Sequence, residues 1–501
     1  MREAVIGLDV GTTVAKAVLF DLSGAEVHVA ARAYALHTPR PGWSELDPEG
    51  IWQAVVEVLR QVASWAARQM SVQAIALASQ GGTLIPCRGD GTPSHPAITW
   101  LDGRSQELVD RWRAEGIADR VRRISGWSLQ AGLPLASIGW LRQARPDAFE
   151  ATERFLAVND FLAQRLTGSP ATSPSMAGEM LLTDIRTGQW SEELCRLVGV
   201  DPEALSPILP ATALLGRIRP EVSRLTGLSP ETVVVNGGQD HSCEALALGL
   251  TSAGTGLLAC GTAWVINAVV GPLPAHVPID AILVGMDLNY HVLPARWIAS
   301  RFLGGLGACL EWWLKQCGGG ASGTRDESWS AFDQALAETE AGCRGLVYLP
   351  PSGAQGAQGS VAGRRQGGFV GLRLDRAWAD MGRAILEGAA YALRSALEQL
   401  TSAGLPLHEM WMIGGAAQSP LWPQIVADVN RVPVLLSQYS HGPALGAAIL
   451  AGLGLGLFDS VEAARDSFQV SARRVEPQEG QAQVYDRQFV AYRRLVRELA
   501  Q

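Results

Sequence analysis

The chain has 501 residues, more than one hydrophobic core usually supports, so two or more domains are expected. Hydrophobic residues make up 47% of it and charged residues 18%, which is typical of a well-buried globular protein and argues against a disordered chain. The net charge is −8 and the basic residues are dispersed, so a nucleic-acid partner is not expected.

The seven cysteines are odd in number and include no CxxC pair. This pattern argues against a disulfide framework and a zinc site, and it favours a reducing cytoplasm. Arg2 and Glu3 lead directly into an apolar strand, without a signal-peptide pattern. Residues 442–458 are uncharged but glycine-rich, and they fall short of the roughly 20 residues that a membrane span needs. A buried helix at about 444–451 and no membrane association are therefore predicted.

Residues 6–20 form an apolar run, a turn at Gly11, Thr12 and Thr13, and a second apolar run. A further turn and a run at 26–31 complete two predicted hairpins. Glycine allows close backbone approach, and hydroxyl and N–H groups suit a phosphate chain. Asp9, just before the turn, could face a metal ion or its water shell. From this stretch alone, a plain edge hairpin explains the residues equally well.

Asp47 and Pro48 form an N-cap followed by a first-turn proline, and apolar residues then recur at helical spacing, which predicts a helix over 48–69. Strands are predicted at 72–78, 83–87 and 97–101, and residues 105–230 are predicted to be mostly helical. A β-branched strand at 232–235 leads to Asp240, and a small-residue helix is expected over 242–250.

Residues 257–266 repeat the opening pattern, with Gly261 and Thr262 in the turn. Internal duplication of a phosphate-binding hairpin is the economical explanation. Ala259 takes the position that matches Asp9, so only the first copy supplies a carboxylate.

In the C-terminal half, a strand is predicted at 346–351, and residues 352–368 indicate a mobile loop that could act as a lid. A long helix is predicted at 378–400. A strand at 408–413 ends at Gly414, Gly415 and Ala416, and Ser419 and Pro420 are predicted to open a helix to about 430. Such a strand–turn–helix junction suits an anion or a nucleotide. A strand at 432–436 and a helical tail from 460 complete the chain.

These motifs, in their order, resemble the FGGY family of carbohydrate kinases within the actin-like, hexokinase-like ATPase superfamily. The resemblance covers nearly the whole chain. Its segments are the phosphate motifs at 9–13 and 261–262, a W-x-E-x-D-P element at 43–48, a sugar-side W-x-D-x-R segment at 100–104, a catalytic-aspartate segment at 238–240, a C-terminal signature at 368–372 with Glu387, Gly388 and Tyr391, an adenosine motif at 414–419 and a closing helix at 442–448.

The chain also departs from the family pattern. Ser137 stands three residues before Trp140, where the family usually has a lysine. Gln80, Gly81 and Gly82 have neither the Met-His of xylulose kinases nor the Arg-Glu of glycerol kinases. The xylulose kinases are the nearest type, but the resemblance leaves the substrate open.

The resemblance implies an α/β fold of two actin-like (ribonuclease H-like) domains with an interdomain catalytic cleft: a sugar-binding domain over 1–246 and a nucleotide-binding domain over 247–501. It implies Asp240 as general base and Asp9 as the residue facing Mg²⁺. The implied sugar contacts are Gln80, Trp100, Asp102, Arg104, Gln239 and His241. The implied ATP contacts are Gly11, Thr12, Thr13, Gly261, Thr262, Gly414, Gly415, Ala416 and Ser419.

The implied function is ATP-dependent phosphorylation of a hydroxyl on a small sugar or polyol, foremost a ketose such as a pentulose, by direct in-line transfer. A homodimer would be ordinary for the fold. Simpler interpretations of single residues remain open: Asp240 as a helix N-cap, Asp102 and Arg104 as a surface ion pair, and His241 as a helix cap. Two other functions also remain open, a non-catalytic sugar or nucleotide sensor and an actin-like ATPase that acts on a protein partner.

Overall fold

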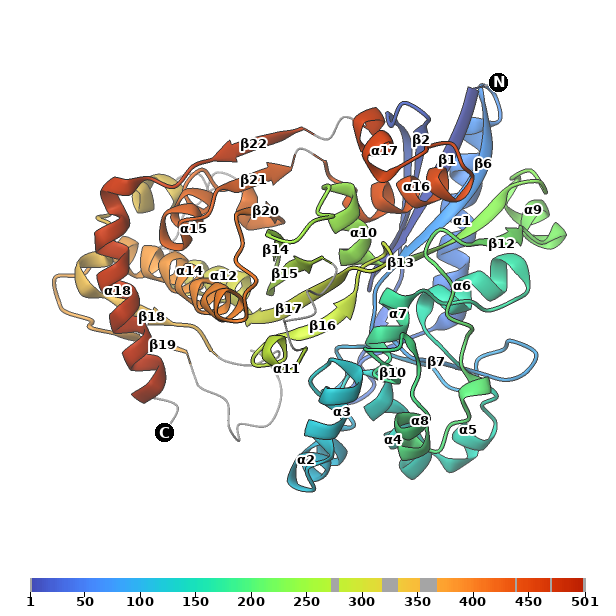
Figure 1. The fold of residues 1–501 in the computed structure, drawn as a ribbon, viewed down its shortest axis with the longest axis horizontal. Coiled ribbons are helices and arrows are strands. Elements are labelled where there is room, and N and C mark those ends of the chain that lie inside the picture. Colours follow the sequence, from blue (N-terminus) through green and yellow to red (C-terminus); the bar gives the residue numbers. More distant parts are fainter. Residues whose placement is uncertain are drawn as a thin grey trace.

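The computed structural model describes residues 2–271, 279–317, 332–351, 367–437, 439–468 and 471–498. They form two lobes, each built on a twisted sheet, with the N-terminal half in one and most of the C-terminal half in the other (Figure 1). The α/β class is therefore confirmed. Most of the loop predicted as a lid, at 352–366, lies outside the described residues.

The sheet of the first lobe has six strands, in the order β12–β13–β6–β1–β2–β3. β1, β6 and β13 are parallel, whereas β1, β2 and β3 form the two predicted antiparallel hairpins. β13 continues four residues past the predicted strand end. The bounds are β1 (Arg2–Val10), β2 (Val14–Asp21), β3 (Glu26–Ala33), β6 (Met70–Ser79), β12 (Leu214–Arg217) and β13 (Val233–Gln239).

Apolar side chains of this sheet alternate between its two faces, and each face packs against its own helices. One face packs on α1 (Pro48–Ala66), α6 (Val158–Thr167) and α9 (Pro220–Thr226). Asp47 caps α1 by accepting a hydrogen bond from the N–H of Glu49, as its position before Pro48 predicts.

The other face packs on α10 (Asp240–Ala247) and α16 (Gly442–Gly454). Figure 1 shows α16, from the end of the chain, beside β1 and β2 from its start. The backbones approach closely there, because a Cβ at Gly7 would lie 1.8 Å from the carbonyl oxygen of Ala444. α16 covers the uncharged stretch, and no helix in the described part of the chain is long and apolar enough to cross a membrane.

A helical region with its own apolar core lies beside this sheet, as the prediction for 105–230 expects. It contains α2 (Gln106–Ala114), α3 (Ile117–Ser125), α4 (Pro134–Ala144), α5 (Pro146–Glu150), α7 (Pro174–Glu179) and α8 (Glu192–Val198), with the 3₁₀ turn η1 (Pro202–Ala204). Three short sheets accompany it. They pair β4 (Leu36–His37), β5 (Glu45–Leu46) and β8 (Ala97–Ile98), then β7 (Ile85–Cys87) and β9 (Arg154–Leu156), and, within the helical region, β10 (Thr183–Asp184) and β11 (Gln189–Trp190).

The sheet of the second lobe has seven strands, in the order β16–β17–β15–β14–β20–β21–β22. Their bounds are β14 (Thr255–Cys260), β15 (Trp264–Val270), β16 (Asp287–Tyr290), β17 (Trp297–Gly304), β20 (Glu409–Ile413), β21 (Val434–Ser437) and β22 (Ala472–Val475). The prediction of an all-helical tail is wrong at β22, which pairs antiparallel with β21 between α17 (Val461–Phe468) and α18 (Glu479–Glu498).

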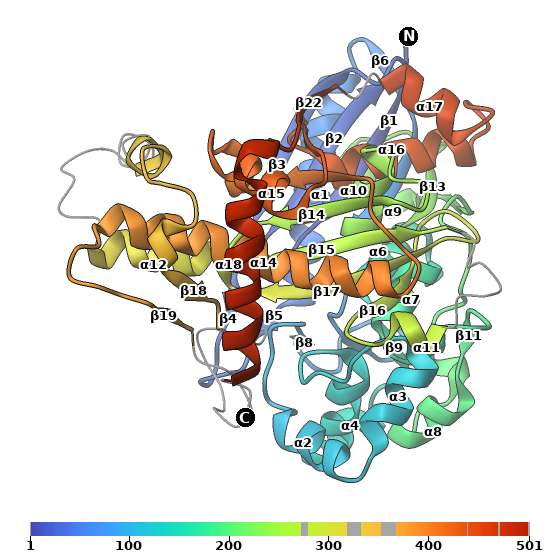
Figure 2. The same cartoon turned by 60° about the vertical axis from the view of Figure 1, so that its left-hand side comes forward.

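One face of this sheet packs on α12 (Leu306–Cys317), α14 (Trp378–Ser402) and α15 (Trp422–Asn430), and Figure 2 shows α18 crossing α14. The start predicted for α15 is wrong: it begins at Trp422, because Gly415–Gln418 form the 3₁₀ turn η3 and Ser419 Oγ accepts from the N–H groups of Leu421 and Trp422. The remaining elements are α11 (Ile279–Ile282), η2 (Cys343–Gly345), β18 (Val347–Leu349) and β19 (Gly368–Val370).

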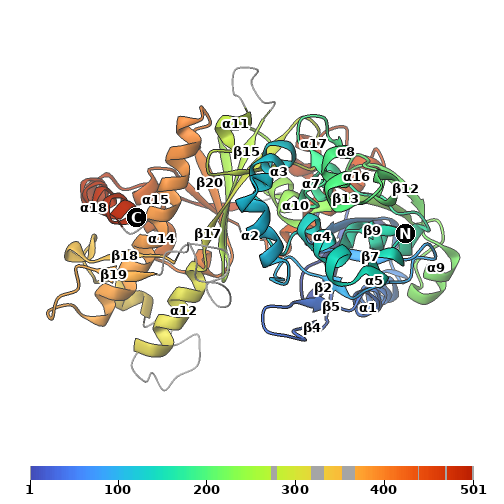
Figure 3. The ribbon, with the colours of Figure 1, turned by 90° about the horizontal axis from the view of Figure 1, so that it is seen from below.

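α10 lies where the two lobes meet (Figure 3). Its Leu246 belongs to the core beneath the first sheet, and Leu248, just past its end, packs against strands of the second. Asp240 is the first residue of this helix. The fold therefore places the predicted catalytic aspartate at the junction of the lobes.

Candidate active site

Three parallel strands bring the central polar residues to one edge of the first sheet. Val10 of β1 and Gln239 of β13 both pair with Ser79 of β6, one from each side. Asp9, Gln80 and Asp240 therefore lie at the carboxyl ends of neighbouring strands, where open α/β sheets usually bind ligands.

Asp9 is buried, and the Nζ of Lys16, its cross-strand partner, lies 4.0 Å from one carboxylate oxygen. Burial and the charge of Asp240 raise the pKa of Asp9 to about 7, against a lowering by Lys16. A divalent cation would offset both the burial of the Asp9 charge and its repulsion by Asp240, so Asp9 fits a magnesium-facing role. No cluster of three or more ligating side chains occurs in the described residues.

Asp240 accepts two hydrogen bonds on one oxygen, Oδ1: from Gln239 Nε2 at 2.6 Å and from the N–H of His241 at 2.7 Å. Within the described part of the chain, Oδ2 is left for a ligand. The alternative that Asp240 caps the helix is wrong, because the N-cap is Gln239, whose Oε1 accepts from the N–H of Ser242 at 2.9 Å. Gln239 thus holds Asp240 in place, and its predicted sugar contact stays a prediction, as does that of His241.

Thr12, Gln80 and Trp100 form a hydrogen-bonded chain beside Asp9. Thr12 Oγ1 donates to Gln80 Oε1 at 3.0 Å, and Trp100 Nε1 donates to Thr12 Oγ1 at 3.1 Å. Gln80 Nε2 is buried without a partner in the described residues, and the Trp100 side chain remains 44% exposed. An unpaired buried amide and an exposed indole are what a sugar hydroxyl and a sugar face would contact.

Asp102 and Arg104 are not a surface ion pair, because both side chains are fully buried. Asp102 binds Arg104 through Nε and Nη2, both at 2.8 Å, and accepts from the N–H of Ser44. Arg104 also pairs with Glu45 at 2.8 Å and lies over the ring of Trp43. These contacts join the segments at 43–48 and 100–104. Arg104 Nη1 is buried and has no hydrogen-bond partner in the described residues.

The two Gly-Thr turns have similar geometry. The N–H of Gly11 donates to Val14 at 3.0 Å, and that of Gly261 donates to Ala263 at 3.1 Å, so neither N–H is free for phosphate. Neither glycine has a positive φ, and a Cβ at either would meet no atom closer than 3.7 Å. The fold does not require glycine at these positions, whereas close approach of a phosphate does. The N–H groups of Thr12, Thr13 and Thr262 and the hydroxyls of Thr13 and Thr262 remain as candidate donors, because the Thr12 hydroxyl donates to Gln80.

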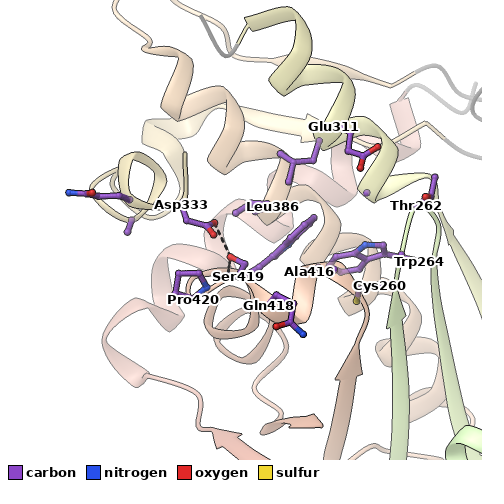
Figure 4. Close-up of a pocket in the computed structure, with 17 residues that line it drawn as sticks. Cys260, Thr262, Trp264, Glu311, Asp333, Leu386, Ala416, Gln418, Ser419 and Pro420 are labelled. Atoms are coloured by element: carbon purple, nitrogen blue, oxygen red, sulfur yellow. Dashed lines mark hydrogen bonds between the residues drawn. The ribbon is translucent and has the colours of Figure 1, made fainter. Parts of the chain in front are cut away.

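A cavity of about 760 Å³ in the second lobe includes the second turn. Gly261, Thr262, Gly415, Ala416 and Ser419 line it, and all five are among the predicted ATP contacts. Gly414 does not line it: its φ is +91° and a Cβ there would lie 2.5 Å from the carbonyl oxygen of Cys260, so it forms the turn. Figure 4 shows Ser419 bonded to Asp333, at 2.9 Å, on one wall of the cavity.

Sequence reasoning missed several cavity residues. Trp264 and Trp422 line it with ring centroids 4.8 Å apart, and Glu311 and Asp333 add carboxylates. The position of Trp264 directly after the second turn could have identified it as a cavity residue. Asp333 has no motif around it that could have done so. Glu179, at the end of α7, is a further missed residue near Asp240, whose charge helps raise the pKa of Glu179.

Comparison with known proteins places this geometry in a family. The N-terminal domain model of the FGGY family of carbohydrate kinases matches residues 4–247, and the C-terminal domain model matches residues 256–455. A xylulose kinase of Staphylococcus xylosus is 27% identical over 98% of this chain and 99% of its own length. A gluconokinase of Bacillus subtilis is 25% identical over 97% and 94%.

Solved structures agree with this result. A xylulose kinase from Rhodospirillum rubrum is 28% identical, with a TM-score of 0.89 and 99% of each chain covered. A gluconate kinase from Lactobacillus acidophilus has a TM-score of 0.91 at 24% identity over 100% of this chain and 99% of its own, a likeness of fold. The two-lobed actin-like architecture is thus confirmed. The chain belongs to the FGGY family of carbohydrate kinases.

Proposed function

We propose that this kinase transfers the γ-phosphoryl group of ATP in line to a hydroxyl of a small sugar or polyol, foremost a ketose such as a pentulose. Phosphoryl transfer needs positioning, neutralisation of charge and an acceptor for the hydroxyl proton. The proposal is carried by one observation: Asp9 and Asp240 lie at the ends of strands that flank β6, beside a Gly-Thr turn.

Asp240 is the base in this proposal. Its Oδ2 takes the proton of the sugar hydroxyl as the bond to phosphorus forms, while Gln239 and His241 hold Oδ1. Asp9 orients the hydrated Mg²⁺, which when bound neutralises charge on the β- and γ-phosphates. The nucleotide occupies the 760 Å³ cavity, with its phosphates toward the Gly261–Thr262 turn. Gln80, Trp100 and Arg104 Nη1 bind the sugar. Residues 1–246 and 247–501 are the proposed sugar-side and nucleotide-side domains.

The test is transfer of radiolabel from [γ-³²P]ATP across a panel of pentuloses, tetroses, polyols and hexonates. A labelled product from at least one neutral sugar or polyol supports the proposal. A panel-wide blank together with measurable ATP binding favours the non-catalytic sensor instead. ATP hydrolysis stimulated by a protein partner, with no labelled sugar, favours the actin-like ATPase.

A further inference from the structure

Gly81 and Glu179 interlock in the proposed sugar site. Gly81 directly follows Gln80, and a Cβ at Gly81 would lie 1.6 Å from Oε2 of Glu179 and 2.3 Å from its Cδ. The backbone of Gly81 does not have a positive φ, so its conformation does not require glycine. The carboxyl of Glu179 therefore fills the space that a side chain at position 81 would take.

The surroundings of this carboxyl are those of the proposed sugar site. Oε2 lies 3.9 Å from the Cβ position of Gly82, which is itself 3.0 Å from the Cβ of Trp100. Burial and the charge of Asp240 raise the pKa of Glu179 to about 8. Glu179 thus lies near the predicted base and beside Gly81 and Gly82, which follow the predicted sugar contact Gln80.

The carboxyl of Glu179 has no hydrogen-bond or ion-pair partner within the described residues, although the side chain is half-buried. A half-buried carboxyl without a protein partner is open to a hydrogen bond from water or from a ligand. Its oxygens can accept hydrogen bonds from the hydroxyl groups of a sugar.

Charge in the site disfavours an acidic substrate. Asp9 and Asp240 lie at the ends of the strands that flank β6, and the carboxyl of Glu179 lies beside Gly81. The charges of the neighbouring cations are balanced, because Lys16 pairs with Asp9 and Arg104 pairs with Asp102 and Glu45. Arg104 Nη1 can donate a hydrogen bond, but neither cation has an unbalanced charge to neutralise a sugar acid, whose carboxylate would enter beside Asp240 and Glu179.

We propose that Glu179 contacts the substrate and determines its class, so that the enzyme accepts an uncharged ketose or polyol and rejects the aldonate of the same chain length. The carboxyl binds a hydroxyl on the part of the sugar away from the reacting one. This inference rests on the proposed function, and it adds a substrate class and a specificity-determining residue to it.

The test compares matched pairs that differ only by a carboxylate, such as xylitol with xylonate and ribitol with ribonate, together with the preferred ketose. In the wild type, the neutral member of each accepted pair is phosphorylated with the higher kcat/KM. Glu179→Ala lowers kcat/KM for the neutral substrate roughly 10- to 100-fold, mainly through KM, because a hydrogen bond to the substrate is lost. The ratio of neutral to aldonate activity falls with it.

Gly81→Ala tests the same carboxyl without altering its charge, because the new Cβ must displace it. Gly81→Ala therefore lowers the ratio of neutral to aldonate activity. Glu179→Gln keeps the size of the side chain, so it lowers kcat/KM for the neutral substrate less than Glu179→Ala does. Gly89 and Glu153 provide a matched control outside the site: a Cβ at Gly89 would lie 2.5 Å from Glu153 Oε2, and Gly89 donates to Glu153 Oε1 at 3.0 Å. Gly89→Ala and Glu153→Gln leave the ratio unchanged.

A wild-type preference for the aldonate overturns the inference but leaves sugar phosphorylation standing. Melting temperatures show whether Glu179→Ala and Gly81→Ala are folded. If both variants fold and change kcat/KM by the same factor for every substrate, Glu179 has only a structural role and the inference fails. If the wild-type enzyme transfers phosphate to no member of the panel, the proposed function is wrong, and this inference, which rests on it, is wrong as well.

Discussion

Asp9 and Asp240 lie at the ends of β1 and β13, the two strands that flank β6, and the charge of Asp240 helps to raise the pKa of Asp9. The two carboxylates come from positions nearly half the chain apart. Their proximity puts the proposed metal-facing group and the proposed base beside the first Gly-Thr turn. The second turn, from β14 and β15, has Ala259 in the position of Asp9, so it adds no third carboxylate.

The glycines of the two turns should matter for the ligand and not for the fold. Gly11→Ala and Gly261→Ala should leave the melting temperature within a few degrees of wild type, because a Cβ meets no close atom at either position. Each should lower kcat/KM for ATP by roughly 10-fold or more, because the added methyl group keeps the phosphates of ATP away from the backbone of the turn. Steady-state kinetics and calorimetric melting measure both effects.

Gly414→Ala is the contrasting variant, since Gly414 has a φ of +91° and a Cβ there would lie 2.5 Å from the Cys260 carbonyl oxygen. It should lower the melting temperature. A large loss of stability in Gly11→Ala would contradict the ligand role of that glycine.

The buried pair of Asp102 and Arg104 should contribute strongly to stability. Arg104→Met leaves the carboxylates of Asp102 and Glu45 without their partner, and breaking a buried pair in this way costs roughly 3–5 kcal/mol. Arg217→Met, which breaks the exposed pair with Glu231, should cost no more than about 1 kcal/mol. Denaturant unfolding measures the free energy of unfolding of both variants. Equal decreases in the two variants would show that burial does not determine how much an ion pair stabilises this protein.

Asp160 should make stability depend on pH. It is buried in α6, and burial raises its pKa to about 7 from the 3.8 that is usual for an exposed aspartate. Between these values the folded state holds a proton that the unfolded state has released, so the free energy of unfolding falls as pH rises, by at most about 1.4 kcal/mol per pH unit. The stabilisation that protonated Asp160 gives the folded state is complete below pH 4 and is lost by about pH 7.

Asp160→Asn removes this titration. The difference in the free energy of unfolding between wild type and Asp160→Asn should therefore change steadily between pH 4 and 7 and level off above. Urea unfolding at several pH values measures it. A difference that does not vary with pH would show that Asp160 has an ordinary pKa.

Ser419→Ala tests the nucleotide cavity. It removes the hydrogen bond to Asp333 and the acceptor for the N–H groups of Leu421 and Trp422, and the loss of such bonds typically costs about 1 kcal/mol. The KM for ATP should rise several-fold, since Ser419 lines the cavity, whereas the KM for the sugar should not change. A change in the sugar KM alone would place the nucleotide elsewhere.

Local sequence signals predicted much of this architecture. The apolar runs around Gly11 and Gly261 predicted both hairpins, and Asp47 before Pro48 predicted the start of α1. These features depend on residues close together in the chain. Asp9 and Asp240 could be singled out for the same reason, because each lies within one residue of the end of a strand and two residues from a glycine.

Features that depend on distant contacts could not be predicted. α16 packs on β1 because Gly7 admits the backbone at Ala444, and neither residue indicates the other in the sequence. Glu179 has no motif around it, and only its contact with Gly81 brings it into the site. β22 is a strand with exposed, basic residues, a pattern that periodicity does not separate from the start of a helix.

Asp240→Asn tests whether Asp240 is the base of a sugar kinase. The amide keeps the shape and cannot take a proton, so kcat for label transfer from [γ-³²P]ATP to the preferred sugar should fall by roughly 100-fold or more. ATP affinity, measured by calorimetry, should stay within about two-fold of wild type, because the nucleotide cavity does not include this residue. Unchanged turnover in Asp240→Asn would contradict the account.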